Sequence, residues 1–500
     1  MLFNSLAFLL FFPLVVGGYF LWPPRHRWML LLAASYFFYG WWRVDYLALI
    51  LFSTLVDYVA ALAMGRRETR AGRRPFLLLS LASNLGLLFS FKYLGFFTST
   101  ADALARLGGG SFPVVELLLP VGISFYTFQT LAYTIDVYRG RQEPERHLGI
   151  FALYVSFFPQ LVAGPIERSQ HLLPQFHRQF ELDEARIALG LRTMLWGFFI
   201  KCVVADRLAP YVDLVYNDPG GFSGLAVWTA TYAFAFQIYG DFAGYSLIAI
   251  GAARVMGYDL MDNFHRPYFS KSISEFWRRW HISLSTWFRD YLYIPLGGNR
   301  VARWRWYVNM MVVFAVSGLW HGAAWTFVVW GVLHGAYLAV GAATGGFRDR
   351  LWARAEAAYR RGMQRGEVVE RMGVDVPVPG GAVRRWWQML LTFHLVLLAW
   401  VFFRAEGVEG AVTLIERAFA VVPGTHASPW LPGFTDADIV ITALAVLALV
   451  AVDLLERRRS FAERLDALAW PVRWGVYLVL AAVVVLFGSY GETTFIYFQF

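Results

Sequence analysis

Long apolar runs recur along the whole chain, and they limit the folds that it can adopt. A membrane-spanning helix needs about 20 mostly apolar residues, or fewer where it is short or re-entrant. Only 16% of the residues are charged, against about 25% in soluble globular proteins, so lipid must solvate much of the surface. The sequence therefore predicts an all-α polytopic membrane protein with about 11–13 transmembrane or re-entrant helices. We expect the spans at about 5–21, 28–42, 46–64, 76–97, 114–138, 187–204, 226–242, 307–319, 323–342, 388–403, 439–454 and 472–487.

A further apolar run, at 148–162, ends in FFPQLVAGP. Its prolines and glycine predict a helix that enters the membrane and turns back. Basic residues gather in the cytoplasmic loops of membrane proteins. If 148–162 does not cross the membrane, two spans separate each basic cluster from the next, and both termini lie outside the cytoplasm. The basic clusters are 65–74, 139–147, 254–306, 343–387 and 455–464.

The net charge of +9 does not indicate nucleic-acid binding, because the arginines cluster between apolar runs. Membrane lipid is the partner that this pattern predicts. Cys202 is the single cysteine, so the chain forms no internal disulfide and no cysteine-rich metal site. We interpret Cys202 as a packing residue and the run 5–21 as the first span, not as a cleaved signal peptide.

Two histidine-containing segments stand out. In VSGLWHGAAWTFVVWGVLHGAYL, His321 lies between Trp320 and Trp325, with a glycine on either side of the Trp-His pair. A histidine in this position is either a general base or a structural histidine inside the bundle, and the spacing leaves both open. The later His334 is predicted to be structural.

The segment 270–300 joins His281 to Arg278, Arg279 and Arg289, with many aromatic residues. The arginines could meet a phosphorylated cofactor at the membrane surface, but the residues alone favour an amphipathic or re-entrant interfacial helix. A metal site with His281 and His321 is possible, but two histidines forty residues apart are weak evidence for one.

Two other motifs place polar residues at membrane depth. QIYGDFAGYS puts Asp241 and Tyr245 in an apolar run, where an ionisable residue is costly. Asp241 either orients an active-site group or forms a structural ion pair. FFPQLVAGPIER (157–168) is expected to shape a pocket.

With these motifs, and the terminal FIYFQF, the chain resembles the membrane-bound O-acyltransferase family, in its bacterial branch containing alginate O-acetyltransferase. The motifs follow the family order, and the resemblance covers nearly the whole chain. It implies one transmembrane domain over residues 1–500. The expected parts are a helical N-terminal part (1–110), the family core (about 111–342), a cytoplasmic loop (about 343–387) and C-terminal spans (388–500).

The resemblance also implies helices around a central tunnel in the bacterial inner membrane. His321 and His281 map onto the family's motif histidines, which reverses the preference that the residues alone gave for His281. Acetyl-CoA is the expected donor, entering from the cytoplasm, with no bound cofactor and no metal.

The implied acceptor is an exported or cell-envelope polysaccharide, often reached through a separate periplasmic acetyltransferase. In the related D-alanylation system a partner's tyrosine-containing tail relays the acyl group. Because this chain ends in TTFIYFQF, Tyr497 is either an acyl relay or part of an aromatic interfacial anchor. A carrier-protein thioester is an alternative donor. A lipid-linked sugar transporter is an alternative class, but the sequence shows no inverted repeat of the kind that transporters have.

Overall fold

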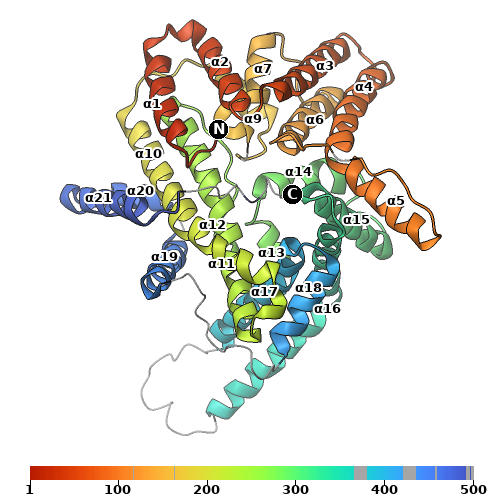
Figure 1. The fold of residues 1–500 in the computed structure, drawn as a ribbon, viewed down its shortest axis with the longest axis vertical. Coiled ribbons are helices and arrows are strands. Elements are labelled where there is room, and N and C mark those ends of the chain that lie inside the picture. The colour runs from red at the N-terminus through yellow and green to blue at the C-terminus, as the bar shows by residue number, and fades with distance from the viewer. Residues whose placement is uncertain are drawn as a thin grey trace. The chain divides into compact units, whose positions relative to one another are not determined.

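The computed structural model describes residues 1–115, 117–162, 164–364, 380–420, 435–456, 459–490 and 496 (Figure 1). Across these ranges the chain forms helices and no strand. The chain separates into two compact units. Unit 1 contains Met1–Asn263 and Val422–Phe500, and unit 2 contains Phe264–Val421.

Unit 1 contains the first twelve helices and the last three. They are α1 (Leu6–Leu21), α2 (Arg27–Gly40), α3 (Leu47–Gly65), α4 (Arg70–Leu88), α5 (Leu94–Leu107), α6 (Ile123–Arg139), α7 (Leu148–Ser156), α8 (Phe158–Leu161), α9 (Ser169–Phe176), α10 (Glu184–Phe198), α11 (Asp206–Asn217), α12 (Gly224–Met256), α19 (Asp436–Leu455), α20 (Phe461–Asp466) and α21 (Trp470–Phe487). A π-helical segment, Phe199–Ala205, joins α10 to α11 without a break.

Unit 2 begins with short elements and continues into long helices. They are α13 (Ile273–Trp277), α14 (Ile282–Phe288), α15 (Arg303–His321), α16 (Trp325–Gln364), α17 (Gly380–Arg404) and α18 (Val408–Phe419). The stretch predicted to be amphipathic or re-entrant thus forms α13, α14 and a π-helical segment at Arg289–Tyr293.

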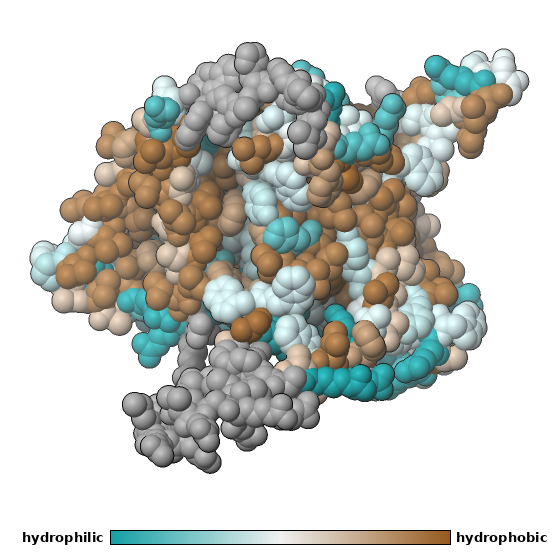
Figure 2. All heavy atoms as spheres, turned by 90° about the horizontal axis from the view of Figure 1, so that it is seen from below, coloured by the Kyte–Doolittle hydropathy of each residue, from teal (hydrophilic) through white to brown (hydrophobic). Residues whose placement is uncertain are grey.

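The predicted polytopic helical fold is confirmed: within the described ranges, eight helices are long and apolar enough to cross a membrane. The remaining predicted spans, 5–21, 28–42, 114–138 and 307–319, coincide with the shorter α1, α2 and α6 and with α15. Exposed leucine, valine and phenylalanine side chains are common, as lipid-facing helices require, and Figure 2 shows broad apolar areas on one face.

Two boundaries differ from the prediction. The helix expected from residue 114 begins at Ile123, because Gly122 adopts a left-handed conformation with φ of 77°. The stretch 343–387, expected to be a loop, continues α16 to Gln364 and begins α17 at Gly380. Its alanines and arginines favour helix, and no proline or glycine lies between Phe347 and Tyr359 to end it.

The segment predicted to turn back in the membrane does return to its starting point. Its apolar part, Leu148–Leu161, is split into α7 and the short α8. Glu145 precedes it and His177 follows it, yet Oε2 of Glu145 lies 2.8 Å from Nε2 of His177. The two ends of this segment therefore lie together in unit 1.

Glycines permit close packing within each unit. In unit 1, a Cβ atom on Gly197 of α10 would lie 2.8 Å from the carbonyl oxygen of Gly244 in α12. In unit 2, a Cβ atom on Gly318 of α15 would lie 2.2 Å from the Phe327 carbonyl oxygen in α16. Small residues allow such close backbone approach between membrane helices. The close approach at Gly197 packs the end of α10, and the π-helical segment that follows it, against α12. The close approach at Gly318 fixes the position of the end of α15.

Candidate active site

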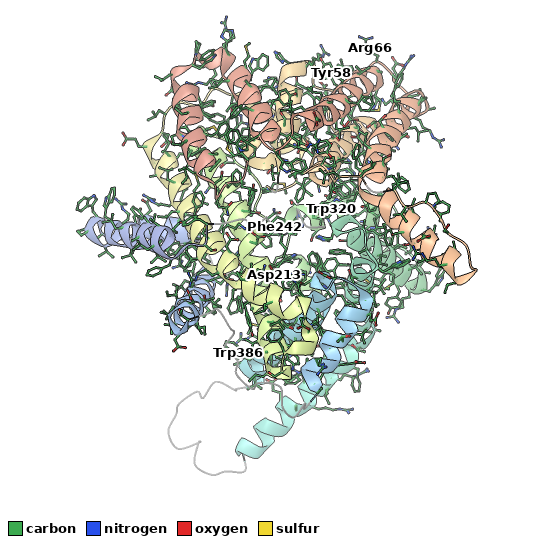
Figure 3. All side chains as sticks on the ribbon, in the orientation of Figure 1. Tyr58, Arg66, Asp213, Phe242, Trp320 and Trp386 are labelled. Atoms are coloured by element: carbon green, nitrogen blue, oxygen red, sulfur yellow. The ribbon has the colours of Figure 1, made fainter. Side chains whose placement is uncertain are left out.

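His321 is the last residue of α15 and lies inside an aromatic cage in unit 2. Its side chain is buried, and its ring centroid lies 5.0 Å from Trp320, 4.9 Å from Trp330 and 5.5 Å from Phe403. These rings come from the end of α15, from α16 and from the end of α17. Figure 3 labels Trp320, the neighbour of His321 on α15. The cage is a water-poor setting for proton transfer.

His281 lies in the same cage, at the N-terminus of α14. Its ring centroid is 6.1 Å from that of His321 and 5.7 Å from that of Trp320. Its backbone φ is 44°, a left-handed conformation that costs energy for a residue with a Cβ atom. Burial holds the pKa of His281 well below its ordinary value, so the imidazole is neutral and has one N–H group to donate.

Several members of this cage were not predicted as site residues. Trp330 and His334 are four positions apart on α16 and share one face of it, and their ring centroids lie 5.0 Å apart. Nδ1 of His334 accepts a hydrogen bond of 3.2 Å from Nε1 of Trp277. The four-residue spacing of Trp330 and His334 could have predicted that they share a helix face. Phe403 belongs to a helix distant in sequence, so no local pattern could have predicted its contact with His321.

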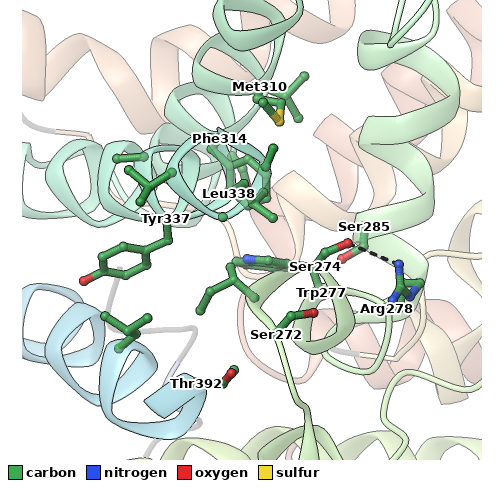
Figure 4. A pocket seen from close by; sticks show the side chains of 18 of the residues that line it. Ser272, Ser274, Trp277, Arg278, Ser285, Met310, Phe314, Tyr337, Leu338 and Thr392 are labelled. Carbon is green, nitrogen blue, oxygen red and sulfur yellow. Dashed lines mark hydrogen bonds between the residues drawn. The ribbon is translucent and has the colours of Figure 1, made fainter. Parts of the chain in front are cut away.

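A cavity of about 1180 Å³ lies within unit 2 (Figure 4), and it is connected to the cage through Trp277, whose ring centroid is 5.6 Å from that of Trp330. Its walls include Trp277, and also Ser317, which is one helical turn before His321 on α15. Three arginines, Arg278, Arg289 and Arg348, line it among largely apolar side chains. This combination of cationic groups and an apolar channel is suited to a ligand that carries phosphates on an apolar or acyl-bearing arm.

The predicted residues around these histidines occupy different environments. Nη1 of Arg278 donates to Oγ of Ser274 at 3.1 Å, and Arg289 forms an ion pair with Asp290. Arg279 forms an ion pair of 2.6 Å with Glu275 and does not line the cavity. Trp325, the first residue of α16, is 54% exposed, and Trp330 on the same helix contacts His321.

Asp241 belongs to a buried ionic cluster in unit 1, whereas the histidine cage belongs to unit 2. Nζ of Lys201 lies 2.5 Å from Oδ1 of Asp241 and 2.7 Å from Oδ1 of Asp206. The backbone N–H of Ile496 donates to Oδ2 of Asp241 at 2.6 Å. Nearby, the backbone N–H of Ser489 donates to the carbonyl oxygen of Cys202 at 3.0 Å. The cluster therefore holds the backbone of Ile496 inside unit 1.

Tyr245 stacks on Phe3, with ring centroids 4.4 Å apart, and is fully buried in unit 1. Tyr497, predicted as a candidate relay, lies outside the described residues, directly after Ile496. In the described ranges, His, Cys, Asp and Glu side chains form no group of three or more that could hold a metal ion.

Comparison with known proteins supplies the family. Residues 145–364, which include both cage histidines, match the model of the membrane-bound O-acyltransferase family. The chain is 36% identical to a probable alginate O-acetylase AlgI of Azotobacter vinelandii and 32% identical to a peptidoglycan O-acetyltransferase of Helicobacter pylori. Both alignments include all of this chain, and they cover 100% of the Azotobacter vinelandii protein and 98% of the Helicobacter pylori protein. A teichoic acid D-alanyltransferase of Streptococcus thermophilus is 29% identical over 58% of this chain and 69% of its own length. The chain belongs to the membrane-bound O-acyltransferase family, close to its alginate O-acetylases, and is an O-acyltransferase.

Proposed function

We propose that the enzyme transfers an acetyl group from cytoplasmic acetyl-CoA toward an exported or cell-envelope polysaccharide. The observation that supports this most is the buried His281–His321 pair beside an arginine-lined cavity. Relatives along the full length of the chain are named for O-acetylation of alginate and of peptidoglycan. The names of these relatives suggest that the acceptor is a polysaccharide. They do not decide whether it is alginate, peptidoglycan or another polymer.

In this proposal His321 is the general base. Its imidazole removes the proton of the acceptor hydroxyl as the oxygen attacks the thioester carbonyl carbon. The C–O bond forms, the C–S bond breaks, and the thiolate of CoA leaves and is protonated. Neutral His281 donates a hydrogen bond to the carbonyl oxygen as negative charge develops there. Trp320 and Trp330 exclude water that would otherwise hydrolyse the thioester.

The cavity is the proposed donor site. Arg278 and Arg289 would bind the phosphates of acetyl-CoA, and Arg348 lines the same cavity. Arg279, which pairs with Glu275, would hold the segment before His281 in place. No resident metal or cofactor takes part in the proposed reaction.

Tyr497 is the proposed acyl relay. Its neighbour in sequence, Ile496, donates its backbone N–H to Asp241. The relay would accept the acetyl group on its phenolic oxygen and pass it to the next acceptor, for which a periplasmic acetyltransferase is the proposed partner. The alternative for the tail is an aromatic anchor at the membrane interface.

We further propose that the enzyme lies in the bacterial inner membrane with both termini outside the cytoplasm. The returning segment between Glu145 and His177 supports the charge count on which this orientation rests. Trp325, exposed at the start of α16, would then meet lipid or the tunnel entrance. Tyr245, stacked on Phe3, would hold the turn of α12 that carries Asp241.

A carrier-protein thioester is the second candidate donor, since a D-alanyltransferase matches more than half of the chain. Purified enzyme in liposomes should be given acetyl-CoA or an acyl-carrier thioester, and its C-terminal peptide analysed by mass spectrometry. We expect an acetyl adduct on Tyr497 with acetyl-CoA alone, absent from Tyr497→Phe. Transfer to polysaccharide that persists in Tyr497→Phe would exclude the relay, and transfer from the carrier alone would exclude acetyl-CoA.

A further inference from the structure

A second pocket, of about 460 Å³, lies in unit 1 and has no part in the proposed reaction. It gathers four pieces of the chain that are distant in sequence: the turn between α1 and α2, the start of α7, the end of α9 with the residues after it, and Tyr258 after α12. Its polar lining is almost entirely basic, with Arg25, His26, Arg27, His147, His177 and Arg178. None of the described residues that line it is a carboxylate. We call it the Arg25–Arg178 pocket.

Arg27 is the buried member of this set, at 9% exposure. Its guanidinium donates to the carbonyl oxygens of Phe20, Trp22 and Phe180, and lies 4.7 Å from the ring centroid of Tyr19. These bonds use three of its five N–H groups. All of these acceptors are neutral, and a buried charge is normally paired with an opposite one. Arg27 therefore carries its positive charge with only neutral acceptors on these hydrogen bonds.

The histidines add donors to the same pocket. Nδ1 of His147 accepts the backbone N–H of Ile150 at 3.1 Å, which leaves Nε2 of a neutral ring to donate. Nε2 of His177 lies 2.8 Å from Oε2 of Glu145, so this carboxylate is already paired. Arg25 and Arg178 are exposed and extend the basic lining to the opening.

The pocket lies at the ends of two apolar helices, which places it at headgroup depth. α1 ends at Leu21, the next residue Trp22 is 47% exposed, and α2 begins at Arg27. Tryptophan and arginine at helix ends mark the membrane interface, where lipid phosphates lie. A volume of this size accepts more than a bare anion.

We propose that the Arg25–Arg178 pocket binds the phosphate group of a membrane phospholipid. The buried Arg27 and the two exposed arginines supply charge-assisted hydrogen bonds to phosphate oxygens. A lipid so bound would join the α1–α2 turn to the residues after α9. This site is separate from the acyl-transfer chemistry and does not depend on it.

The test compares binding of phosphatidylglycerol, diacylglycerol and inorganic phosphate to the full-length protein in detergent. Native mass spectrometry and the thermal unfolding midpoint are the readouts. We expect saturable binding of phosphatidylglycerol and none of diacylglycerol, which lacks the phosphate. Arg25→Ala/Arg178→Ala should weaken that binding at least about tenfold, because two charge-assisted hydrogen bonds are lost.

The matched control is Arg66→Ala/Arg70→Ala, which removes the same charge between α3 and α4, outside the pocket (Arg66 is labelled in Figure 3). It should bind phosphatidylglycerol like the wild type. An equal loss in both double variants would overturn the proposal, since bulk charge would then explain it. A pocket-dependent response to inorganic phosphate as strong as that to the lipid would overturn the lipid assignment in favour of a soluble phosphate.

Discussion

The imidazole ring of His281 lies 6.1 Å from that of His321, although the two residues are forty positions apart in the sequence. His321 is the last residue of the long helix α15, and His281 is the N-cap of the short helix α14. Their shared neighbour is Trp320, at 5.0 Å from one ring and 5.7 Å from the other. In the proposed reaction His321 is the base and His281 is the hydrogen-bond donor, and both must reach the same acyl group. The short distance between their rings is compatible with these roles.

Replacing His321 by alanine should abolish acyl transfer while the protein still folds. Loss of a general base lowers a rate by about 10²–10⁴-fold. The measurement is transfer from radiolabelled acetyl-CoA, with the thermal midpoint recorded on the same sample.

His334→Leu is the matched control, because His334 is a buried histidine of the same cage region. Its loss leaves Nε1 of Trp277 without its acceptor, at a cost of about 1–3 kcal/mol. We expect a lower thermal midpoint with transfer largely kept. Near wild-type transfer by His321→Ala would refute the assignment of the base.

His281 should tolerate asparagine better than leucine. Asparagine adopts the left-handed conformation found at this position, with φ of 44°, more readily than leucine does, and it retains an N–H donor. Removing one donor to the developing oxyanion costs about 10²–10³-fold in kcat. We therefore expect His281→Leu to lose about that much and His281→Asn to lose less, with the difference in kcat rather than in KM. Equal activity of both variants would argue for a purely structural histidine.

Asp241→Ala should release the C-terminal segment, whereas Asp206→Ala should not. Both carboxylates contact Lys201, so either substitution breaks a buried ion pair and costs about 3–5 kcal/mol. Only Asp241 also accepts the Ile496 N–H. Digestion by carboxypeptidase should therefore be faster in Asp241→Ala than in Asp206→Ala at matched stability. Equal digestion would show that the hydrogen bond does not hold the tail.

The pair of His171 with Glu167 should make stability depend on pH. Nδ1 of His171 lies 2.8 Å from Oε2 of Glu167, and this hydrogen bond raises the pKa of His171 above its ordinary 6.5. A raised pKa means that the protonated form stabilises the fold below pH 6.5 and that this contribution is lost as pH rises through the folded-state pKa. The thermal midpoint, measured from pH 6 to 8, should decline in the wild type and decline less in His171→Gln. The same decline in both would exclude the pair as its source.

Much of the fold was predictable because helices that span a lipid bilayer appear in the sequence as long apolar runs. Every expected span overlaps a helix, since an apolar run in a membrane must satisfy its backbone hydrogen bonds internally. Helix ends were less predictable. The continuation of α16 to Gln364 depends on helix propensity, and the late start of α6 depends on the conformation of Gly122.

The site was predictable only in part. Its two histidines were identified from the residues together with a family resemblance, and the residues alone favoured an interfacial role for His281. Phe403 reaches His321 from a helix more than eighty positions away, and no local pattern marks it. The hydrogen bond from Ile496 to Asp241 was equally hidden, because it joins residues 255 positions apart through a backbone N–H that every residue except proline carries.

Gly318→Ala should displace His321 without touching it. The new Cβ atom would lie 2.2 Å from the carbonyl oxygen of Phe327, so α15 and α16 must separate. Overpacking of this kind costs about 1–3 kcal/mol, and a shift of about 1 Å at a catalytic group can cost about 10²-fold in rate. Gly345→Ala, on α16 with no atom within 4 Å of the new Cβ, is the control and should leave stability unchanged or slightly higher. The thermal midpoint and the acyl-transfer rate should both fall in Gly318→Ala, and a rate that survives there would show that His321 does not need the close contact of α15 with α16.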